Sequence, residues 1–230
     1  MRKKQIIPHL IGVLAALCWI LFGITASIFH IAGDSCLLAD RMLALAPPAQ
    51  TGLPATEYPA MGSLVAEYLT GEREPFQLEY TGADGWTVVC FHDYEAAHMA
   101  DCRFLIRLDR IVMDACLAAA LALSGVALAI RRVRESFFRG MGFGLCTAGV
   151  LAAGMAAWAA VNFRGLFVTF HRVAFTNDGW LLNPRTDLLI RLMPEALFMD
   201  LGLRGLLFSL IAPLSIIVLV LLRGKRKNNA

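Results

Sequence analysis

Apolar positions along this 230-residue chain are concentrated in four long blocks, and are not spread at the short periods of a soluble core. The blocks cover residues 10–29, 115–130, 140–161 and 206–222. A helix needs about 20 mainly apolar residues to cross the hydrocarbon core of a bilayer. The second block reaches this length if it begins near Ile111, and the fourth lies at the short end of the range. The pattern therefore predicts four transmembrane helices.

Basic residues predict the orientation of these helices. Three basic residues precede the first block, four arginines lie between the second and third, and four basic residues follow the last one. Because cytoplasmic loops are rich in Lys and Arg, both termini are predicted to be cytoplasmic. This topology also explains the basic residues at the chain ends, so they do not require a nucleic-acid partner. The first block could be a signal peptide, but it is longer than the usual apolar stretch of about 7–15 residues, which favours a retained helix.

The predicted fold class is an α-helical membrane protein with four transmembrane helices and a small α+β extracytoplasmic cap. The transmembrane helices are expected at 9–31, 111–130, 140–161 and 205–222. The cap is expected to comprise segments 32–110 and 162–204, and the cytoplasmic parts are the loop 131–139 and the tail 223–230.

Composition narrows the class of protein further. Hydrophobic residues make up 58% of the chain and charged residues 17%, whereas soluble domains have about 45–50% and about 25%. These values exclude a disordered chain, which would be poor in apolar residues, and they argue against a soluble domain. Six cysteines in a chain of this length are too few for a disulfide-stapled miniprotein.

The cap segments carry local signals for a helix, a hairpin and a further helix start. Apolar residues from Met61 to Leu69 recur at helical spacing, and Gly71 is well placed to end that helix. Alternating apolar and polar residues at 76–80 and a second candidate strand at 86–91, separated by a glycine-containing turn, predict a β-hairpin. Asp93 is predicted to cap the helix that continues into the second transmembrane block.

Two histidines have a sequence context that suggests chemistry. Glu95, His98 and Asp101 share one face of a predicted helix, where a carboxylate can fix the tautomer of an imidazole. His171 lies on an aromatic helical face with Phe167 and Phe170, where a dry pocket can form. The alternative is a set of interfacial anchors within an aromatic belt. Paired imidazoles at a membrane interface would suit acyl transfer between lipid-like groups.

Other chemistries find less support in the sequence. No cysteine or histidine spacing matches a zinc pattern, and the nucleophile elbow, P-loop and Rossmann glycine patterns are absent from the sequence. Cys36, Cys90 and Cys102 fall in the predicted outer segments. Cys90 and Cys102 could form a disulfide, but packing roles are favoured, and the sequence leaves the question open.

Two stretches resemble motifs of a known family. Residues 95–101, EAAHMAD, resemble the E-x-x-H-M-x-D element of the bacterial lipoprotein intramolecular transacylase family, Lit. Residues 170–180, FHRVAFTNDGW, resemble its F-H-x-x-x-F-x-N-D-x-W element, and residues 187–194 continue the likeness. The four-helix layout with two outer segments is also similar. The chain departs from the family pattern at Cys102, Arg103 and Gly179.

The resemblance implies a defined reaction and a set of site residues. Family members move the sn-2 acyl chain of a diacylglyceryl-cysteine lipoprotein to the cysteine α-amino group, which yields a lyso-form lipoprotein. Their two catalytic histidines correspond to His98 and His171, with His171 expected as the base toward the amine. His98 is expected to stabilise the oxyanion or to donate a proton. The residues expected to orient groups or bind substrate are Glu95, Asp101, Phe167, Phe170, Phe175 and Trp180.

The same resemblance implies the surroundings of the reaction. It predicts an extracytoplasmic site in the bacterial cell membrane, diacylated lipoproteins and membrane lipid as partners, a monomeric enzyme, and no cofactor or metal. Two other classes stay open from the residues alone. One is a membrane lipid or peptidyl hydrolase that uses the same histidines with water, and the other is a non-catalytic accessory protein of the cell envelope.

Overall fold

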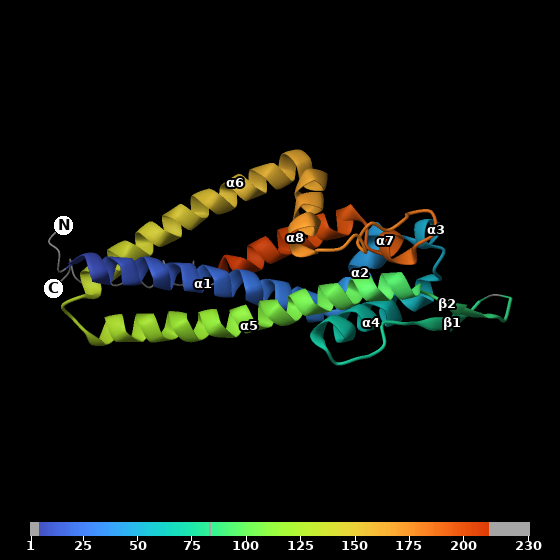
Figure 1. Cartoon of the computed structure of the whole chain (residues 1–230), viewed down its shortest axis with the longest axis horizontal. Helices are drawn as coiled ribbons and strands as arrows, with labels where there is room; N and C mark the ends of the chain where they lie inside the picture. Colours follow the sequence, from blue (N-terminus) through green and yellow to red (C-terminus); the bar gives the residue numbers. More distant parts are fainter. Residues whose placement is uncertain (1–4, 83, 212–230) are drawn as a thin grey trace. The chain divides into compact units, whose positions relative to one another are not determined.

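The computed structural model describes residues 5–82 and 84–211, which form a mostly helical chain with one small sheet (Figure 1). The helices and strands are α1 (Ile6–Gly33), α2 (Ser35–Leu45), α3 (Pro48–Thr51), the 3-10 helix η2 (Ala55–Glu57), α4 (Tyr58–Thr70), β1 (Glu79–Thr81), β2 (Thr87–Val89), α5 (Asp93–Ala129), α6 (Arg134–Ala174), α7 (Leu188–Leu192) and α8 (Glu195–Ser209).

Three of the described helices are long and apolar enough to cross a membrane (Figure 1). They are α1, α5 and α6, with 28, 37 and 41 residues. In the fourth predicted span, residues 205–209 belong to α8, whereas residues 212–222 lie outside the described part of the chain. In α5, the apolar stretch begins only after Arg110, so the first part of this helix is polar enough to lie outside a membrane.

The described residues divide into two compact units. The first consists of the described parts of Met1–Ser27, Arg110–Ala160 and Gly205–Ala230, and the second of Ile28–Asp109 and Val161–Arg204. The predicted cap segments, 32–110 and 162–204, correspond closely to the second unit.

Glycines bring α1 and α6 into close contact within the first unit. A Cβ atom on Gly140 would lie 1.9 Å from the carbonyl oxygen of His9, and one on Gly12 would lie 2.0 Å from that of Phe137. No side chain fits at these distances. The two backbones therefore lie in close contact, as the backbones of membrane helix pairs do where small residues face each other. The indole of Trp19 donates a hydrogen bond to Ser124 at 3.3 Å and so connects α1 to α5.

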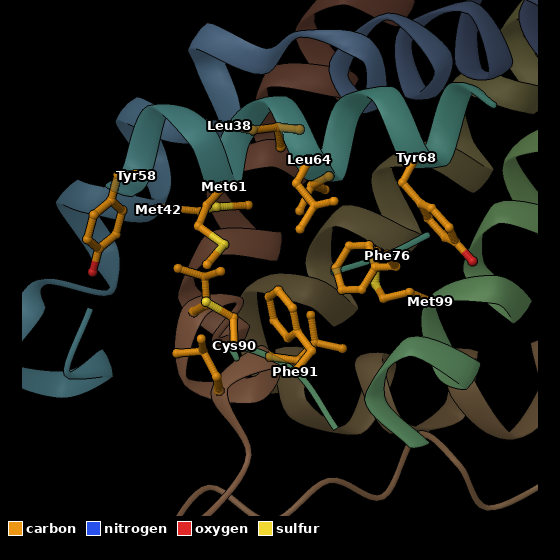
Figure 2. Packing of buried hydrophobic residues seen from close by; sticks show 14 of the residues in the cluster. Leu38, Met42, Tyr58, Met61, Leu64, Tyr68, Phe76, Cys90, Phe91 and Met99 are labelled. Atoms are coloured by element: carbon orange, nitrogen blue, oxygen red, sulfur yellow. The ribbon is translucent and has the colours of Figure 1, made fainter. Parts of the chain in front are cut away.

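A hydrophobic core holds the second unit together, with α2 and α4 packed against each other (Figure 2). A Cβ atom on Gly62 of α4 would lie 2.4 Å from the carbonyl oxygen of Ser35, so this glycine allows the helices to pack. Burial of each large apolar side chain contributes about 1.5–3 kcal/mol. The labelled core residues are Leu38, Met42, Tyr58, Met61, Leu64, Tyr68, Phe76, Cys90, Phe91 and Met99.

The helix and the hairpin predicted for the cap are both present. Helix α4 covers residues 61–69 and ends at Gly71, which adopts the left-handed conformation with φ of 91°. Strands β1 and β2 pair antiparallel, with Tyr80 opposite Val88. The strands are shorter than predicted, because Phe76 and Phe91 leave the hairpin and pack against each other in the core, with ring centroids 4.7 Å apart and the rings tilted by 41°.

The start of α5 differs from the prediction. The first helical hydrogen bond runs from the amide of Ala96 to the carbonyl of His92, so His92 is the N-cap and Asp93 is the first helical residue. The prediction that Asp93 caps the helix was therefore wrong. In this register Glu95 is the third helical residue, and its carboxylate accepts a hydrogen bond from the amide of His92 at 2.8 Å. A glutamate at this position is the reciprocal half of a capping box.

Helix α6 is interrupted at Asn162, which has non-helical backbone angles of φ −150° and ψ 70°. The side-chain oxygen of Asn162 accepts a hydrogen bond from the amide of Gly165 at 2.8 Å. This bond is the N-cap arrangement that starts a new helix. The final part of α6, which carries Phe167 and His171, is therefore a separate capped helix within the second unit.

Candidate functional site

His98 and His171 lie side by side in the second unit. His98 comes from the first turns of α5 and His171 from the last turn of α6, and their ring centroids are 6.1 Å apart. Both side chains are buried, with 8% of each residue exposed. The structure thus brings together the two histidines that the sequence motifs singled out.

Aromatic rings surround His171. The nearest is Phe167, with ring centroids 4.2 Å apart, followed by Trp180 at 5.1 Å. Phe170 and Phe175 lie at 5.4 Å and 5.5 Å, and Phe175 also packs edge-on against His98 at 5.1 Å. Phe170 keeps half of its surface exposed, whereas Phe175 is buried. The four aromatic residues predicted for the site therefore all contact the histidine pair.

The tautomer of His171 follows from a single hydrogen bond. Its Nδ1 lies 2.8 Å from the carbonyl oxygen of Phe167. A carbonyl oxygen can only accept, so Nδ1 must carry the hydrogen and donate it. In the neutral ring, Nε2 then has a free lone pair. His171 is thereby prepared to accept a proton through Nε2.

Burial keeps both imidazoles neutral near pH 7. Burial lowers the pKa of His98, the neighbouring His171 lowers it further, and the carboxylate of Asp101 opposes both effects. Burial also lowers the pKa of His171, against the opposing effect of its hydrogen bond to Phe167. An ordinary histidine titrates near pH 6.5. Both rings are therefore largely uncharged at neutral pH, which is the form that can act as a base.

Glu95, three residues before His98 on α5, is a buried carboxylate that caps two helices. It is completely buried. One oxygen accepts from the amide of His92 at 2.8 Å, and the other accepts from the amide of Leu189 in α7 at 2.8 Å. Both oxygens are thus engaged by backbone amides at helix N-termini, where a negative charge is favoured. The structure places Glu95 as a support for the helix that carries His98.

Asp101 connects the two sequence motifs. Its carboxylate accepts a hydrogen bond from the side-chain amide of Asn177 at 2.9 Å. Asn177 follows the end of α6, only a few residues after His171. This bond fixes the loop that carries Trp180 against α5, and Asp101 also acts on His98 electrostatically.

A third carboxylate, that of Asp187, orders the segment between α6 and α7. It accepts hydrogen bonds from Tyr94 at 2.7 Å, from Thr186 at 2.6 Å and from the amide of Asn183 at 2.7 Å. Burial alone would raise the pKa of Asp187, but the three hydrogen bonds together lower it. The charged carboxylate thus connects the start of α5 to the start of α7.

A pocket of about 240 Å³ opens next to the aromatic residues. Phe175 and Trp180 belong both to its wall and to the shell around the histidines. The remaining lining residues are Arg172, Thr176, Asn177, Asp178 and Leu181. The pocket is therefore lined by polar residues together with two aromatic rings that also contact His171. Within the described ranges, no group of three His, Cys, Asp or Glu side chains is arranged to hold a metal ion.

Sequence reasoning missed three participants in this arrangement. Asn177 and Asp187 lie within the stretches that resemble the family but have no predicted role of their own, and Cys102 is predicted as a packing residue or a disulfide partner. Cys102 follows His98 by four residues on one helix, so its proximity could have been inferred from helical spacing. The bonds of Asn177 and Asp187 join distant segments, and no local pattern signals them.

The comparisons with known proteins agree with this architecture. The family model "Lipoprotein intramolecular transacylase Lit" matches residues 13–198 of the chain. The comparison with curated proteins found no match. Among solved structures, the membrane integral lipoprotein intramolecular transacylase Lit from Bacillus cereus has a TM-score of 0.77 at 21% sequence identity, over 97% of this chain and 99% of that chain. A structure of that Bacillus cereus protein with a histidine-to-arginine substitution has a TM-score of 0.71 at 21% identity, over 96% of this chain and 95% of the other.

At this identity the solved structures establish the fold, while the family model covers most of the chain and establishes the family. The resemblance of the two histidine motifs to this family is thereby confirmed. This chain belongs to the lipoprotein intramolecular transacylase family, Lit, and is an acyltransferase of the membrane.

Proposed function

We propose that this chain moves the sn-2 acyl chain of a diacylglyceryl-cysteine lipoprotein to the α-amino group of the same cysteine, with His98 and His171 as the catalytic pair. One observation supports this most strongly. Two buried, neutral imidazoles, one from each family motif, lie with their ring centroids 6.1 Å apart. The product is a lyso-form lipoprotein with an N-linked acyl chain.

The reaction requires one proton to move between two heteroatoms of the same substrate. The amine nitrogen attacks the ester carbonyl carbon, a tetrahedral intermediate forms, and the bond from that carbon to the glyceryl oxygen breaks. The proton lost by nitrogen ends on the glyceryl oxygen. Because an amide replaces an ester and nothing is consumed, the balance needs no activated donor.

The two histidines have complementary parts in this proposal. An α-amino group has a pKa of about 7.7–8.0, so a base must remove its proton to keep it nucleophilic at neutral pH. His171 serves as that base, because its Nε2 lone pair is free while Nδ1 donates to the Phe167 carbonyl. His98 stabilises the oxyanion through a ring N–H, and the proton that His171 took from the amine passes to the leaving glyceryl oxygen, which returns both rings to the neutral form. General acid–base help of this kind contributes roughly 10²–10⁴-fold.

The aromatic shell supplies the positioning. The amine and the ester belong to one flexible molecule, so much of the barrier is the entropy of folding them together. We propose that Phe167, Phe170, Phe175 and Trp180 hold the acyl chain beside His171, since all four rings lie within 5.5 Å of its ring centroid. Glu95 and Asp101 support the reaction by holding the helix and the loop that carry the site.

Tandem mass spectrometry of lipoprotein N-termini tests the function. Intramolecular transfer produces an isomer, so expression of this chain in a strain with diacyl lipoproteins is expected to leave the intact mass of the N-terminal peptide unchanged. Fragmentation should place one acyl chain on nitrogen, and reagents that label amines should no longer react. A hydrolase would lower the mass and release free fatty acid, and an accessory protein would leave the amine free. Either result would overturn the proposal.

Isotope labelling separates transfer within one molecule from transfer between molecules. Labelled and unlabelled substrates are mixed in the same detergent micelles and converted together. Intramolecular transfer predicts that each product keeps its own acyl label. Crossed products would indicate a covalent acyl-enzyme or a donor from a second lipid, and would contradict the proposed mechanism.

We propose that the site faces the extracytoplasmic side of the bacterial membrane. In this arrangement the chain crosses the membrane four times, at 9–31, 111–130, 140–161 and 205–222, with both termini, the loop 131–139 and the tail 223–230 inside. Segments 32–110 and 162–204 form the extracytoplasmic cap, which gives His98 and His171 access to membrane lipid and to diacylated lipoproteins. The support for this orientation is the basic residues on one side of every apolar block.

Reporter fusions test this topology. Fusions after Lys4, Arg132 and Arg226 are expected to report the cytoplasmic side. Fusions at Gly82 and Asn183, in the two cap segments, are expected to report the outer side. A cytoplasmic signal at Gly82 would place the histidines on the cytoplasmic side, away from the diacylated lipoproteins, and would contradict the proposed orientation.

A further inference from the structure

Cys102 lies one helical turn after His98 on α5, and its sulfur contacts the imidazole. The distance from Sγ to Nε2 of His98 is 3.7 Å. Burial raises the pKa of Cys102 to about 12, and the nearby charge of Asp101 raises it in the same direction. The sulfur is therefore a neutral thiol near neutral pH. A neutral thiol has one hydrogen that it donates weakly, and its sulfur is a weak acceptor.

The other nitrogen of His98 is in an unusual position. Nδ1 is buried and has no hydrogen-bond partner among the described residues. Buried polar atoms are nearly always satisfied, and an exception calls for a functional explanation. The residue as a whole is 92% buried, since only 8% of it is exposed. His98 therefore offers one nitrogen that the protein engages through Cys102 and one that it leaves available.

We propose that the thiol of Cys102 fixes the tautomer of His98, so that Nδ1 carries a hydrogen that is free to bind the acyl oxygen. The alternative is an Nε2 hydrogen directed at sulfur. That arrangement pairs a good donor with a poor acceptor and leaves the Nδ1 lone pair, a good acceptor, unused. Donation from the thiol to the Nε2 lone pair uses the stronger acceptor and is the favoured arrangement.

This tautomer makes the two histidines complementary. His171 donates through Nδ1 to the Phe167 carbonyl and keeps a lone pair on Nε2. His98 accepts through Nε2 from Cys102 and keeps a hydrogen on Nδ1. One ring thus presents an acceptor to the amine and the other presents a donor to the oxyanion. The assignment of these two tasks rests on the proposed function, and Cys102 acts in it as a positioning residue.

Two pairs of variants separate hydrogen bonding from packing. Cys102→Thr and Cys102→Val have nearly the same volume, but only threonine retains a hydroxyl donor. Cys102→Ser and Cys102→Ala form a smaller pair with the same difference, which covers the case in which a branched side chain prevents folding. Cys36→Ala removes an exposed cysteine of α2, far from this contact in the sequence, and serves as the control for loss of a thiol.

The direct readout is the tautomer of His98, measured by nitrogen NMR of protein labelled at histidine in detergent micelles. The His98 resonances are assigned as those lost in His98→Gln. Wild-type protein is expected to show a protonated Nδ1 and an unprotonated Nε2, and Cys102→Ser and Cys102→Thr should retain this state. Cys102→Ala and Cys102→Val should shift the ring toward the other tautomer. A wild-type His98 that carries its hydrogen on Nε2 would overturn the proposal.

The kinetic readout should follow the same division. The variants without a donor are expected to lose about tenfold in kcat with little change in KM, a fraction of the roughly 10²–10⁴-fold that acid–base help supplies. The serine or threonine variant should recover most of that loss. Equal rates in the two members of both pairs would contradict the proposal. If the NMR result holds but no protein transfers an acyl chain, the tautomer assignment stands and the proposed function fails.

Discussion

Replacement of either histidine of the pair with alanine is expected to abolish the conversion of diacyl to lyso-form lipoprotein. His171→Ala removes the lone pair that accepts the amine proton, and His98→Ala removes the donor to the acyl oxygen. Each loss should lower the rate by at least about 10²-fold. The double variant should be little worse than either single one, because residues that act as one unit are not additive. Tandem mass spectrometry of the lipoprotein N-terminus measures the result.

Three comparisons sharpen this experiment. His9→Ala changes a histidine of the first unit and should retain activity. The activity of Phe170→Ala should lie between that of the wild type and those of the histidine variants, because Phe170 contacts the His171 ring but keeps 52% of its surface exposed. Co-expression of His98→Ala with His171→Ala should not restore activity, because we propose a monomeric enzyme with both residues in one chain. An active double variant would remove the mechanism, and restoration on co-expression would show a site shared between two copies.

Glu95→Ala is expected to destabilise the second unit strongly while leaving both histidines in place. It removes one charge-assisted acceptor from each of two helix starts, at the amides of His92 and Leu189. Hydrogen bonds to charged groups are worth about 1.5–3 kcal/mol each, so the loss in unfolding free energy should be roughly 3 kcal/mol or more. For a chain of this size that corresponds to a fall in Tm of roughly 6–12 °C.

Glu95→Gln is the informative partner of this variant. Its amide oxygen can satisfy one of the two backbone amides, while its NH₂ group cannot accept from the other. The glutamine variant should therefore have a Tm between those of the wild type and Glu95→Ala. Glu72→Ala changes an exposed glutamate after α4 and should stay within about 0.5 kcal/mol of the wild type. A Glu95→Ala protein that melts at the wild-type temperature would contradict the capping role.

The elements predicted from the sequence are those that short-range periodicity controls. Apolar blocks long enough to cross a bilayer are present in α1, α5 and α6. Helix α4 with its terminal Gly71 and the β1–β2 hairpin follow equally from local pattern and turn residues. These features depend on neighbours along the chain, and the sequence lists those neighbours directly.

The start of α5 shows where local preference fails. Aspartate is a preferred N-cap residue, yet Asp93 is the first helical residue and the cap position falls on His92. The register that is adopted places Glu95 where one carboxylate can bind the amides of both His92 and Leu189. A contact with α7 thus helps to decide between two locally acceptable starts, and a capping rule applied to one segment does not include such a contact.

The sequence by itself determined a membrane protein, a small mixed α and β segment between its apolar blocks, and two histidines in distinctive motifs. Only the tertiary structure decided that His98 and His171 meet, that Phe167 sets the tautomer of one ring, and that Cys102 contacts the other. The physical reason is that helical spacing reports which residues share a face, whereas acid–base chemistry depends on which atoms of different segments approach within about 3–4 Å. That approach is produced by the break at Asn162 and by the buried carboxylate of Glu95, and both act through folding of the whole second unit.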